Sequence, residues 1–240
     1  MVDIHCHILH GIDDGAENFD TSFEMAKLAV ESGTTEIFAT PHANIPDTEC
    51  INTSATVSER VKSFNEILVR EGVPLKIYTG CEIFAAGDFI KLLKKGNLLT
   101  LNNSNYVLVE FDFFEHHASV FMKLEELLSE GYIPVVAHPE RYAFIEEDEN
   151  CINIIKNMGC LIQCNKGSVT GRFGHSAKFI AHEMLVREQV DFIASDAHSS
   201  RMRTPILTDA YQMVCELYNK DYADLLFDIN PRKILNHEKI

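Results

Sequence analysis

The sequence has no long apolar run, no basic tract and no CxxC pair, and each absence excludes a class of protein. A membrane-spanning helix needs about 20 consecutive apolar residues, and no such run occurs in the 240 residues. Lys and Arg number 21 against 36 Asp and Glu, and the resulting net charge of −15 argues against nucleic-acid binding. Only 12 Gly and 7 Pro accompany 46% hydrophobic residues, which excludes collagen and disorder and suits a protein with a buried core.

The seven cysteines form an odd set without the spacing of a disulfide framework or a thiolate zinc site. The N-terminal segment lacks a positively charged start followed by an apolar stretch, so we expect the protein to remain in a reducing cytoplasm. No cysteine has an arginine six residues later, as cysteine-dependent phosphatases require, and no GxxxxGK phosphate loop occurs. Covalent cysteine catalysis and a P-loop are therefore disfavoured.

A strand-like run followed by a helix-like segment recurs along the chain without a linker or composition shift. We therefore predict a single domain over residues 1–240, built from consecutive βα units with parallel strands. The pattern alone does not distinguish a closed barrel from an open, doubly wound sheet. The predicted strands cover residues 2–7, 35–40, 75–81, 106–110, 132–137, 160–164 and 190–195.

Amphipathic segments between the strands carry helix signals. In the first, Thr21 and Glu24 have capping-box spacing, and Gly33 stands where a C′ glycine would end the helix. Near the C-terminus, Asn230 followed by Pro231 predicts the N-cap and first residue of a last short helix. Further helices are predicted over residues 57–70, 119–130, 150–158 and 177–188.

Nearly every predicted strand ends in a residue able to bind a metal. In a parallel α/β fold these ends meet at one face, where active sites lie. An isolated HxH or a single carboxylate after a strand is common by chance, so the recurrence predicts one shared site. Only the sixth strand lacks such a residue; the others supply His5 and His7, His42, Glu82, Glu110, His138, and Asp196 with His198.

The segment after the first strand, HGIDDGAE, places two carboxylates between glycines. Gly11 and Gly15 permit a tight turn that could aim Asp13 or Asp14 back into the site, although an ordinary turn before a helix is the alternative. The residues alone leave open which aspartate takes part.

Arginines and aromatic residues follow the predicted ligands. Arg141 lies close to His138, and Arg201 and Arg203 come shortly after His198, which suggests recognition of an oxyanion by a planar guanidinium. Surface ion pairs are the alternative. The stretch FDFFEHH, residues 111–117, could form a wall for a substrate ring or could be core and surface of the next helix.

Imidazole and carboxylate ligands without thiolates favour Mn²⁺, Fe²⁺ or Zn²⁺ over Ca²⁺ or a structural cysteine-bound zinc. Two or more such ions beside arginines indicate phosphoester hydrolysis. The metals would lower the pKa of a bound water and hold the oxygens of an in-line displacement at phosphorus.

The motifs DIHCH, HGIDDGA, TPH, GCE, VEF, AHPERY and SDAH occur in this order along the chain. Together they resemble the polymerase-and-histidinol-phosphatase (PHP) superfamily. Within it they are most similar to the bacterial manganese-dependent tyrosine-protein phosphatases of capsule and exopolysaccharide operons, the CpsB/YwqE type. The resemblance extends from Asp3 to the C-terminal NPRKILN segment.

This resemblance implies a distorted seven-stranded (β/α) barrel that binds three metal ions, most commonly Mn²⁺. It implies that Arg141 and Arg203 receive the phosphoryl oxygens, with Arg201 as the alternative to Arg203. The implied substrate is the phosphotyrosine tail of a bacterial tyrosine kinase that controls polysaccharide export. The implied metal ligands are His5, His7, Glu82 and Asp196 for the first ion, Glu82, Glu110 and His138 for the second, and Asp14, His42 and His198 for the third.

Three other functions compete with this one. A PHP phosphatase for a small phosphomonoester such as histidinol phosphate would use the same metals. A metal-stabilised regulatory module would bind a kinase without turnover. Metal-dependent amide hydrolysis also begins from an HxH on the first strand, but this chain has Glu110 rather than lysine at the fourth.

Overall fold

The computed structural model describes residues 1–47 and 53–240, and within these ranges every strand pairing is parallel. The strands are short and, except for β4, largely buried, as expected for strands covered on both faces. They are β1 (Val2–Cys6), β2 (Glu36–Ala39), β3 (His42–Ala43), β4 (Lys76–Thr79), β5 (Glu82–Phe84), β6 (Tyr106–Glu110), β7 (Ile133–Ala137), β8 (Leu161–Asn165) and β9 (Phe192–Ala194).

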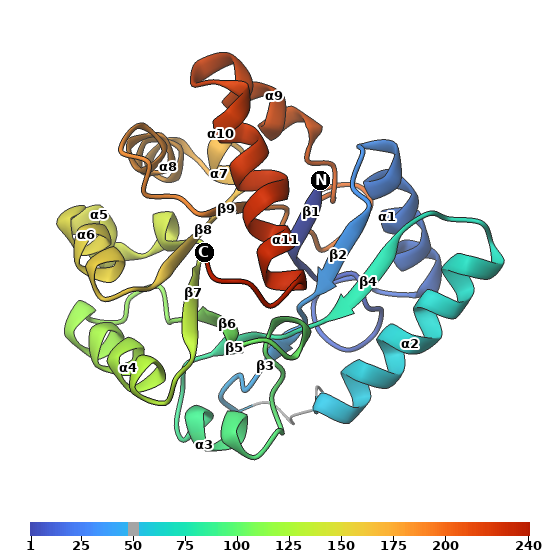
Figure 1. Ribbon diagram of the computed structural model, residues 1–240, viewed down its shortest axis with the longest axis horizontal. Helices are drawn as coiled ribbons and strands as arrows, with labels where there is room; N and C mark the ends of the chain where they lie inside the picture. Colours follow the sequence, from blue (N-terminus) through green and yellow to red (C-terminus); the bar gives the residue numbers. More distant parts are fainter. Residues whose placement is uncertain (48–52) are drawn as a thin grey trace.

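Helices connect the strands and surround them (Figure 1). They are α1 (Phe19–Glu31), α2 (Ser54–Arg70), α3 (Phe89–Lys94), α4 (His117–Ser129), α5 (Ala143–Glu147), α6 (Asn150–Asn157), α7 (Lys166–Val169), α8 (His175–Val186), α9 (Thr208–Leu217), α10 (Lys220–Asp224) and α11 (Asn230–Leu235). Shorter helical turns are η1 (Leu101–Asn103), η2 (Pro139–Arg141) and η3 (Leu225–Ile229).

All seven predicted strands are present, but the predicted strand count is wrong. The described residues form nine strands in two sheets, ordered β1-β2-β4 and β3-β5-β6-β7-β8-β9. The two extra strands, β3 and β5, directly follow the ends of β2 and β4. Pro41 precedes β3 and has no N–H for a strand ladder, and the Gly80–Cys81 pair separates β4 from β5. Each interruption comes just before a predicted metal ligand, His42 or Glu82.

The first and last strands of the chain lie beside each other. Cys6 forms a parallel bridge with Ala197, just after β9. Backbone hydrogen bonds run from His7 N to Ala197 O (2.9 Å) and from Asp196 N to His5 O (2.8 Å). The residues that follow the carboxyl ends of β1 and β9 therefore lie next to each other.

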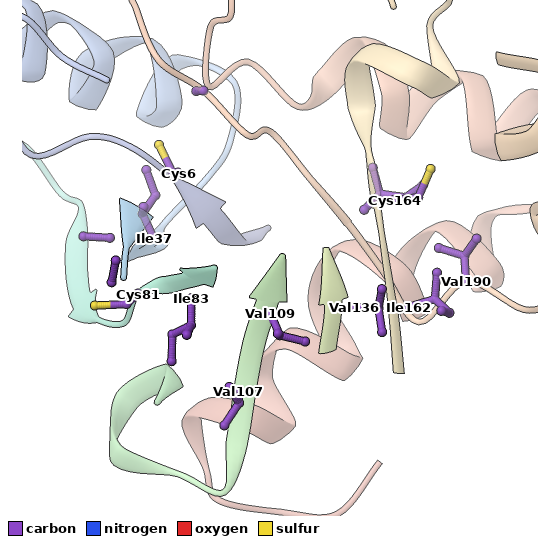
Figure 2. Close-up of a cluster of buried hydrophobic side chains, with 14 of the residues drawn as sticks. Cys6, Ile37, Cys81, Ile83, Val107, Val109, Val136, Ile162, Cys164 and Val190 are labelled. Atoms are coloured by element: carbon purple, nitrogen blue, oxygen red, sulfur yellow. The ribbon is translucent and has the colours of Figure 1, made fainter. Parts of the chain in front are cut away.

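Strand side chains divide between two apolar clusters. The larger cluster packs the strands against the surrounding helices, and Figure 2 shows labelled members of it along β1, β2, β5, β6, β7 and β8. The smaller cluster joins alternate positions of the same strands, such as Val2, Leu108 and Phe192, and includes Ile234 of α11. Apolar side chains thus occupy both faces along the strands. The polar candidate ligands lie at the strand ends.

Two predicted helix caps are wrong. The N-cap of α1 is Asn18, whose side chain accepts a hydrogen bond from Thr21 N, so Thr21 lies inside the first turn. Asn230 is helical and continues from η3 into α11, and its side chain donates to Asp191 O instead of capping. The C′ glycine is confirmed: Gly33 has φ +83° directly after the C-cap Ser32.

Within the described ranges, none of the helices combines the length and apolarity that a membrane crossing requires. Five of the six cysteines in these ranges are buried. Cys50, the seventh cysteine of the sequence, lies outside the described residues.

Candidate metal centre

The metal-ligand candidates on β1 depend on an irregularity in that strand. The β1–β2 register shifts between Asp3 and Cys6, so β1 has one more residue than β2 there. Ile4 belongs to the smaller apolar cluster and Cys6 to the larger one. A bulge of this kind redirects the side chains that follow it. The imidazoles of His5 and His7 consequently face each other, with their Nε2 atoms 3.2 Å apart.

Two carboxylates face this histidine pair. Glu82 Oε2 lies 3.1 Å from His5 Nε2 and 3.3 Å from His7 Nε2. Asp196 Oδ1 lies 3.5 Å from each of the same two nitrogens. Four buried donor atoms from β1, β5 and the end of β9 thus surround one point.

A second group forms around the carboxylates that begin β5 and end β6. His138 Nε2 lies 3.0 Å from Glu82 Oε1 and 3.5 Å from Glu110 Oε1. His42 Nδ1 lies 3.0 Å from Glu82 Oε2 and 3.5 Å from Glu110 Oε2. Glu82 therefore directs one oxygen at each of these histidines, and its Oε2 also faces the first group.

The third group involves the loop after β1. Asp14 Oδ1 lies 3.5 Å from His42 Nε2 and 3.3 Å from His198 Nε2. Potential ligand atoms of His7, Asp14, His42 and His198 all lie within 4.8 Å of one another. His7 and His42 therefore belong to two groups each, and the nine predicted ligands form one continuous cluster.

The neighbouring aspartate has a different position. Asp13 Oδ2 lies 2.7 Å from His7 Nδ1 and accepts a hydrogen bond from His42 N, while Oδ1 accepts one from Gly15 N. Asp13 thus contacts the outer nitrogen of His7, and a carboxylate there fixes the imidazole tautomer and makes Nε2 a better ligand. The structure places Asp14, not Asp13, among the inward-facing donors.

The backbone is strained at two of the candidate ligands. His138 has φ +34° and Asp196 has φ +48°, both in the left-handed region that residues other than glycine seldom adopt. Each residue comes directly after a strand or within two residues of its end. Such strain persists where the surroundings demand a particular side-chain direction, and it is common at functional sites.

The donor set fits divalent cations. Within the described chain, Glu82 Oε2 and His198 Nε2 are buried and make no hydrogen bond of acceptable geometry. Five imidazoles and four carboxylates, without a thiolate, converge on this cluster. A cation would satisfy these buried acceptors, and the ligand types suit Mn²⁺, Fe²⁺ or Zn²⁺.

The electrostatics keep the central carboxylates ionised. Burial opposes ionisation of Glu82, but the charge of His5 and the hydrogen bond from His138 hold the pKa of its carboxyl well below the ordinary value. Burial likewise opposes ionisation of Asp196, and the charges of His5 and Arg203 lower its pKa. Glu110 behaves differently, because burial and the charge of Glu82 raise its pKa.

An outer layer of polar side chains went unpredicted, and the sixth predicted strand supplies most of it. On β8, Gln163 Oε1 lies 2.8 Å from His5 Nδ1, and Asn165 Nδ2 donates to Asp196 Oδ2 at 2.6 Å. Gln163 Nε2 also donates to Asn165 Oδ1. In the sequence, Gln163 and Asn165 stand at i and i+2 at the end of the sixth predicted strand. Their side chains are amides, which are neither imidazole nor carboxylate ligands, so they did not indicate a role at a metal site.

Gly15 is required by the close approach of its loop to β1. A Cβ at this position would lie 2.3 Å from His7 O and 2.5 Å from His7 Cβ. Ala16 N donates to His7 O at 3.1 Å, which holds the loop in this place. The glycine therefore allows the Asp13–Asp14 pair to fold back over the histidines.

The predicted arginines lie at the edge of the cluster. Arg203 Nη2 contacts Asp196 Oδ2 at 2.5 Å, and Arg141 Nη1 lies 3.8 Å from the same oxygen. Arg201 is exposed and lines a cleft of about 930 Å³ that also reaches Asp14 and His198. The aromatic stretch is divided: Phe111 is buried, Phe113 lies half-buried against Arg141, and Phe114 is exposed.

Replacing Asp13 with asparagine is expected to weaken divalent-metal affinity by about 10- to 100-fold, because His7 loses its outer carboxylate. Titration of the apoprotein with Mn²⁺ against a competing chelator measures the effect. Asp221→Asn, an exposed change on α10, is the matched control. Unchanged affinity in the Asp13 variant would contradict the supporting role.

Histidines and carboxylates gathered at the carboxyl ends of parallel strands, with arginines beside them, define an α/β protein with a candidate polynuclear metal centre. The chain belongs to the CpsB/CapC family, described as capsular polysaccharide synthesis, whose match covers residues 1–236.

Its relatives include two curated tyrosine-protein phosphatases. YwqE of Bacillus subtilis (strain 168) is 38% identical over 240 residues, which cover all of this chain and 93% of YwqE. CpsB of Streptococcus pneumoniae is 32% identical over 245 residues, with both chains fully covered.

Solved structures agree with this assignment. A crystal structure from work on YwqE of Bacillus subtilis and CpsB of Streptococcus pneumoniae, described as unique metal-dependent tyrosine phosphatases, matches with a TM-score of 0.94 and 34% identity. The match covers 100% of this chain and 96% of the chain in that crystal structure. A histidinol phosphate phosphatase from Lactococcus lactis matches with a TM-score of 0.61 and 13% identity, covering 94% of each chain, and thus shares the fold alone.

Proposed function

We propose that this protein is a metal-dependent tyrosine-protein phosphatase that hydrolyses phosphotyrosine. The observation that carries the proposal is the single, largely buried cluster of nine imidazole and carboxylate side chains with two arginines at its edge. The names of the full-length relatives support phosphotyrosine as the substrate class.

The nine ligands divide into three overlapping sets. His5, His7, Glu82 and Asp196 would hold one ion, Glu82, Glu110 and His138 a second, and Asp14, His42 and His198 a third. Divalent cations bound there supply positive charge to the phosphoryl oxygens and lower the pKa of a water molecule toward neutrality. The distances between donor atoms add His7 to the third set and His42 to the second as shared donors.

The arginines bind and orient the phosphoryl group. Arg203 is fixed by Asp196, and Arg141 projects its guanidinium beside the same carboxylate with a longer contact. Planar guanidinium groups suit phosphoryl oxygens, since two N–H donors match two oxygens. A tyrosyl leaving group has a pKa of about 10 and thus needs less protonation than a serine alkoxide.

Mn²⁺ is the proposed metal, with Fe²⁺ and Zn²⁺ as the other cations that the ligands accept. The donor set contains no thiolate, which disfavours a cysteine-bound zinc site. Reconstitution of metal-free protein with each ion separately, followed by measurement of both metal binding and phosphate release, distinguishes the three.

The proposed physiological partner is the phosphotyrosine tail of a bacterial tyrosine kinase that regulates capsular or exopolysaccharide synthesis. The family description, capsular polysaccharide synthesis, supports this setting. Loss of tyrosine phosphorylation on a co-purified kinase after addition of the phosphatase, with none after addition of a Glu82→Ala variant, tests the partner.

The strand arrangement is also proposed to close as the seven-unit (β/α) barrel that the family resemblance implies. In this view β2 with β3, and β4 with β5, are each one interrupted strand. The bridge between Cys6 and Ala197 supports closure between the first and last units.

A comparison of substrates tests the proposed activity. Metal-loaded protein is expected to hydrolyse a phosphotyrosine peptide with higher kcat/KM than histidinol phosphate. A clear preference for histidinol phosphate would replace the proposal with the small-molecule phosphatase. Absence of phosphate release from the peptide and from p-nitrophenyl phosphate would favour a regulatory module instead.

A further inference from the structure

The Arg141 guanidinium lies over two aromatic rings. Its Cζ lies 4.6 Å from the centroid of Phe113 and 4.9 Å from that of Phe173. The Phe173 ring also contacts the second arginine, with Arg203 Cζ at 5.7 Å. Phe173 is therefore one aromatic contact shared by both predicted phosphate-binding residues.

The loop that carries Phe173, residues 170–174 between α7 and α8, is shaped to hold the ring in this place. A Cβ on Gly167 would lie 2.7 Å from Phe173 Cε2 and 2.9 Å from Cζ, so the ring packs against the bare backbone of Gly167. Gly167 O accepts hydrogen bonds from Arg172 N (2.7 Å) and Phe173 N (3.3 Å).

The same loop is tied to the segment that carries Arg203. Arg172 Nη1 donates to Met202 O at 3.3 Å. Buried Lys166 Nζ donates to Ile206 O at 2.5 Å, on the other side of Arg203. The start of α7 and the loop after it thus hold the residues on both sides of Arg203 in the chain.

Contacts of this kind with aromatic rings are compatible with ligand binding by the arginine donors. A guanidinium stacks through its faces, whereas its N–H groups lie in its plane and point outward. The ion-pair contact of Arg141 with Asp196 Oδ2 is long, at 3.8 Å, so the rings contribute much of its fixed orientation. The negative face of an aromatic ring also offsets repulsion between two nearby guanidinium groups.

We infer that Phe173 is a positioning residue for the phosphoryl group, acting through Arg141 and Arg203. The inference rests on the proposed phosphatase function, which it deepens by naming what orients the two arginines. Phe173 holds their guanidinium groups so that their N–H donors meet the phosphoryl oxygens without rearrangement when the substrate binds.

The test compares Phe173→Leu, which keeps apolar bulk but removes the ring, with Phe173→Tyr, which retains the aromatic face. In Phe173→Leu, KM for p-nitrophenyl phosphate and the inhibition constant of inorganic phosphate should each rise about tenfold, and kcat should change much less. Phe173→Tyr should restore both constants toward those of the unmodified protein. Phe179→Leu, an exposed change on α8, is the matched control.

Calorimetric titration of metal-loaded protein with inorganic phosphate gives the same comparison without turnover. Metal content and Tm of each variant show whether the fold and the metal centre are intact. Gly167→Ala, whose added Cβ would displace the Phe173 ring, should weaken phosphate binding as Phe173→Leu does.

Unchanged phosphate affinity in Phe173→Leu with full metal content would overturn the inference. Equal weakening in Phe173→Leu and Phe173→Tyr would also overturn it, because packing and not the aromatic face would then be responsible. Failure of the proposed function has a different signature: the unmodified protein would release no phosphate from a phosphotyrosine peptide, whereas the calorimetric comparison could still succeed.

Discussion

Replacement of Glu82 by alanine is expected to abolish phosphate release, with a loss of at least about 1,000-fold in kcat, because the central residue of the proposed metal centre is removed. The Glu82 carboxylate lies within 3.3 Å of nitrogens on His5, His7, His42 and His138. No other candidate carboxylate contacts so many of the imidazoles at this range. Its loss should therefore release more than one ion.

Measurement of kcat together with bound metal per chain checks this expectation. Glu125→Ala, an exposed change on α4, is the matched control and should retain both activity and metal. Activity retained in Glu82→Ala with full metal content would show that the chemistry occurs elsewhere on the protein.

Replacement of Arg141 by alanine should lower kcat/KM by about 100-fold while leaving the metals bound, since preorganised donors to a charged oxygen have effects of this size. Arg141 is the cleaner of the two arginines to test. Its contact with Asp196 is 3.8 Å long, whereas Arg203 lies 2.5 Å from the same carboxylate and its loss would also disturb the proposed metal centre.

Kinetics on a phosphotyrosine peptide and metal analysis of the same samples separate the two effects. Arg187→Ala, which removes an exposed arginine paired with Glu149 and Glu183, is the control. A normal kcat/KM in Arg141→Ala would exclude this side chain from phosphate binding, and loss of metal would assign it a structural role instead.

The strand positions were predictable because buried parallel strands are continuous apolar runs. The short strands after the interruptions were not predictable, since β3 has two residues and β5 three, too few to form an apolar run. In the structure each interruption is followed at once by a short strand that begins with His42 or Glu82. The breaks thus place the candidate ligands His42 and Glu82 at the starts of new short strands, which an uninterrupted strand would not do.

The ligand candidates were predictable from strand ends because the chemistry restricts metal ligands to a few residue types. The supporting side chains were not predictable, because Gln163 and Asn165 lie at the end of the one predicted strand that has no imidazole or carboxylate there. Likewise, sequence alone left Asp13 and Asp14 equivalent. Only the folded loop, held close to His7 by Gly15, gives them different neighbours.

The net negative charge of this protein does not exclude a phosphorylated partner. The chain carries −15 overall, yet four carboxylates of that total lie in the proposed metal cluster. Three divalent cations would make this cluster positive, and two arginines adjoin it. An acidic protein can therefore offer a cationic site to a phosphorylated substrate.

The most direct test of the proposed metal centre is the metal content of the protein purified without chelators. Elemental mass spectrometry, combined with the protein concentration, gives the number of bound ions per chain. We predict two to three divalent cations per chain, with manganese prominent, since eight of the nine side chains form three overlapping groups and His138 adjoins them through Glu82 and Glu110. Fewer than two bound ions per chain in catalytically active protein would contradict the proposed mechanism.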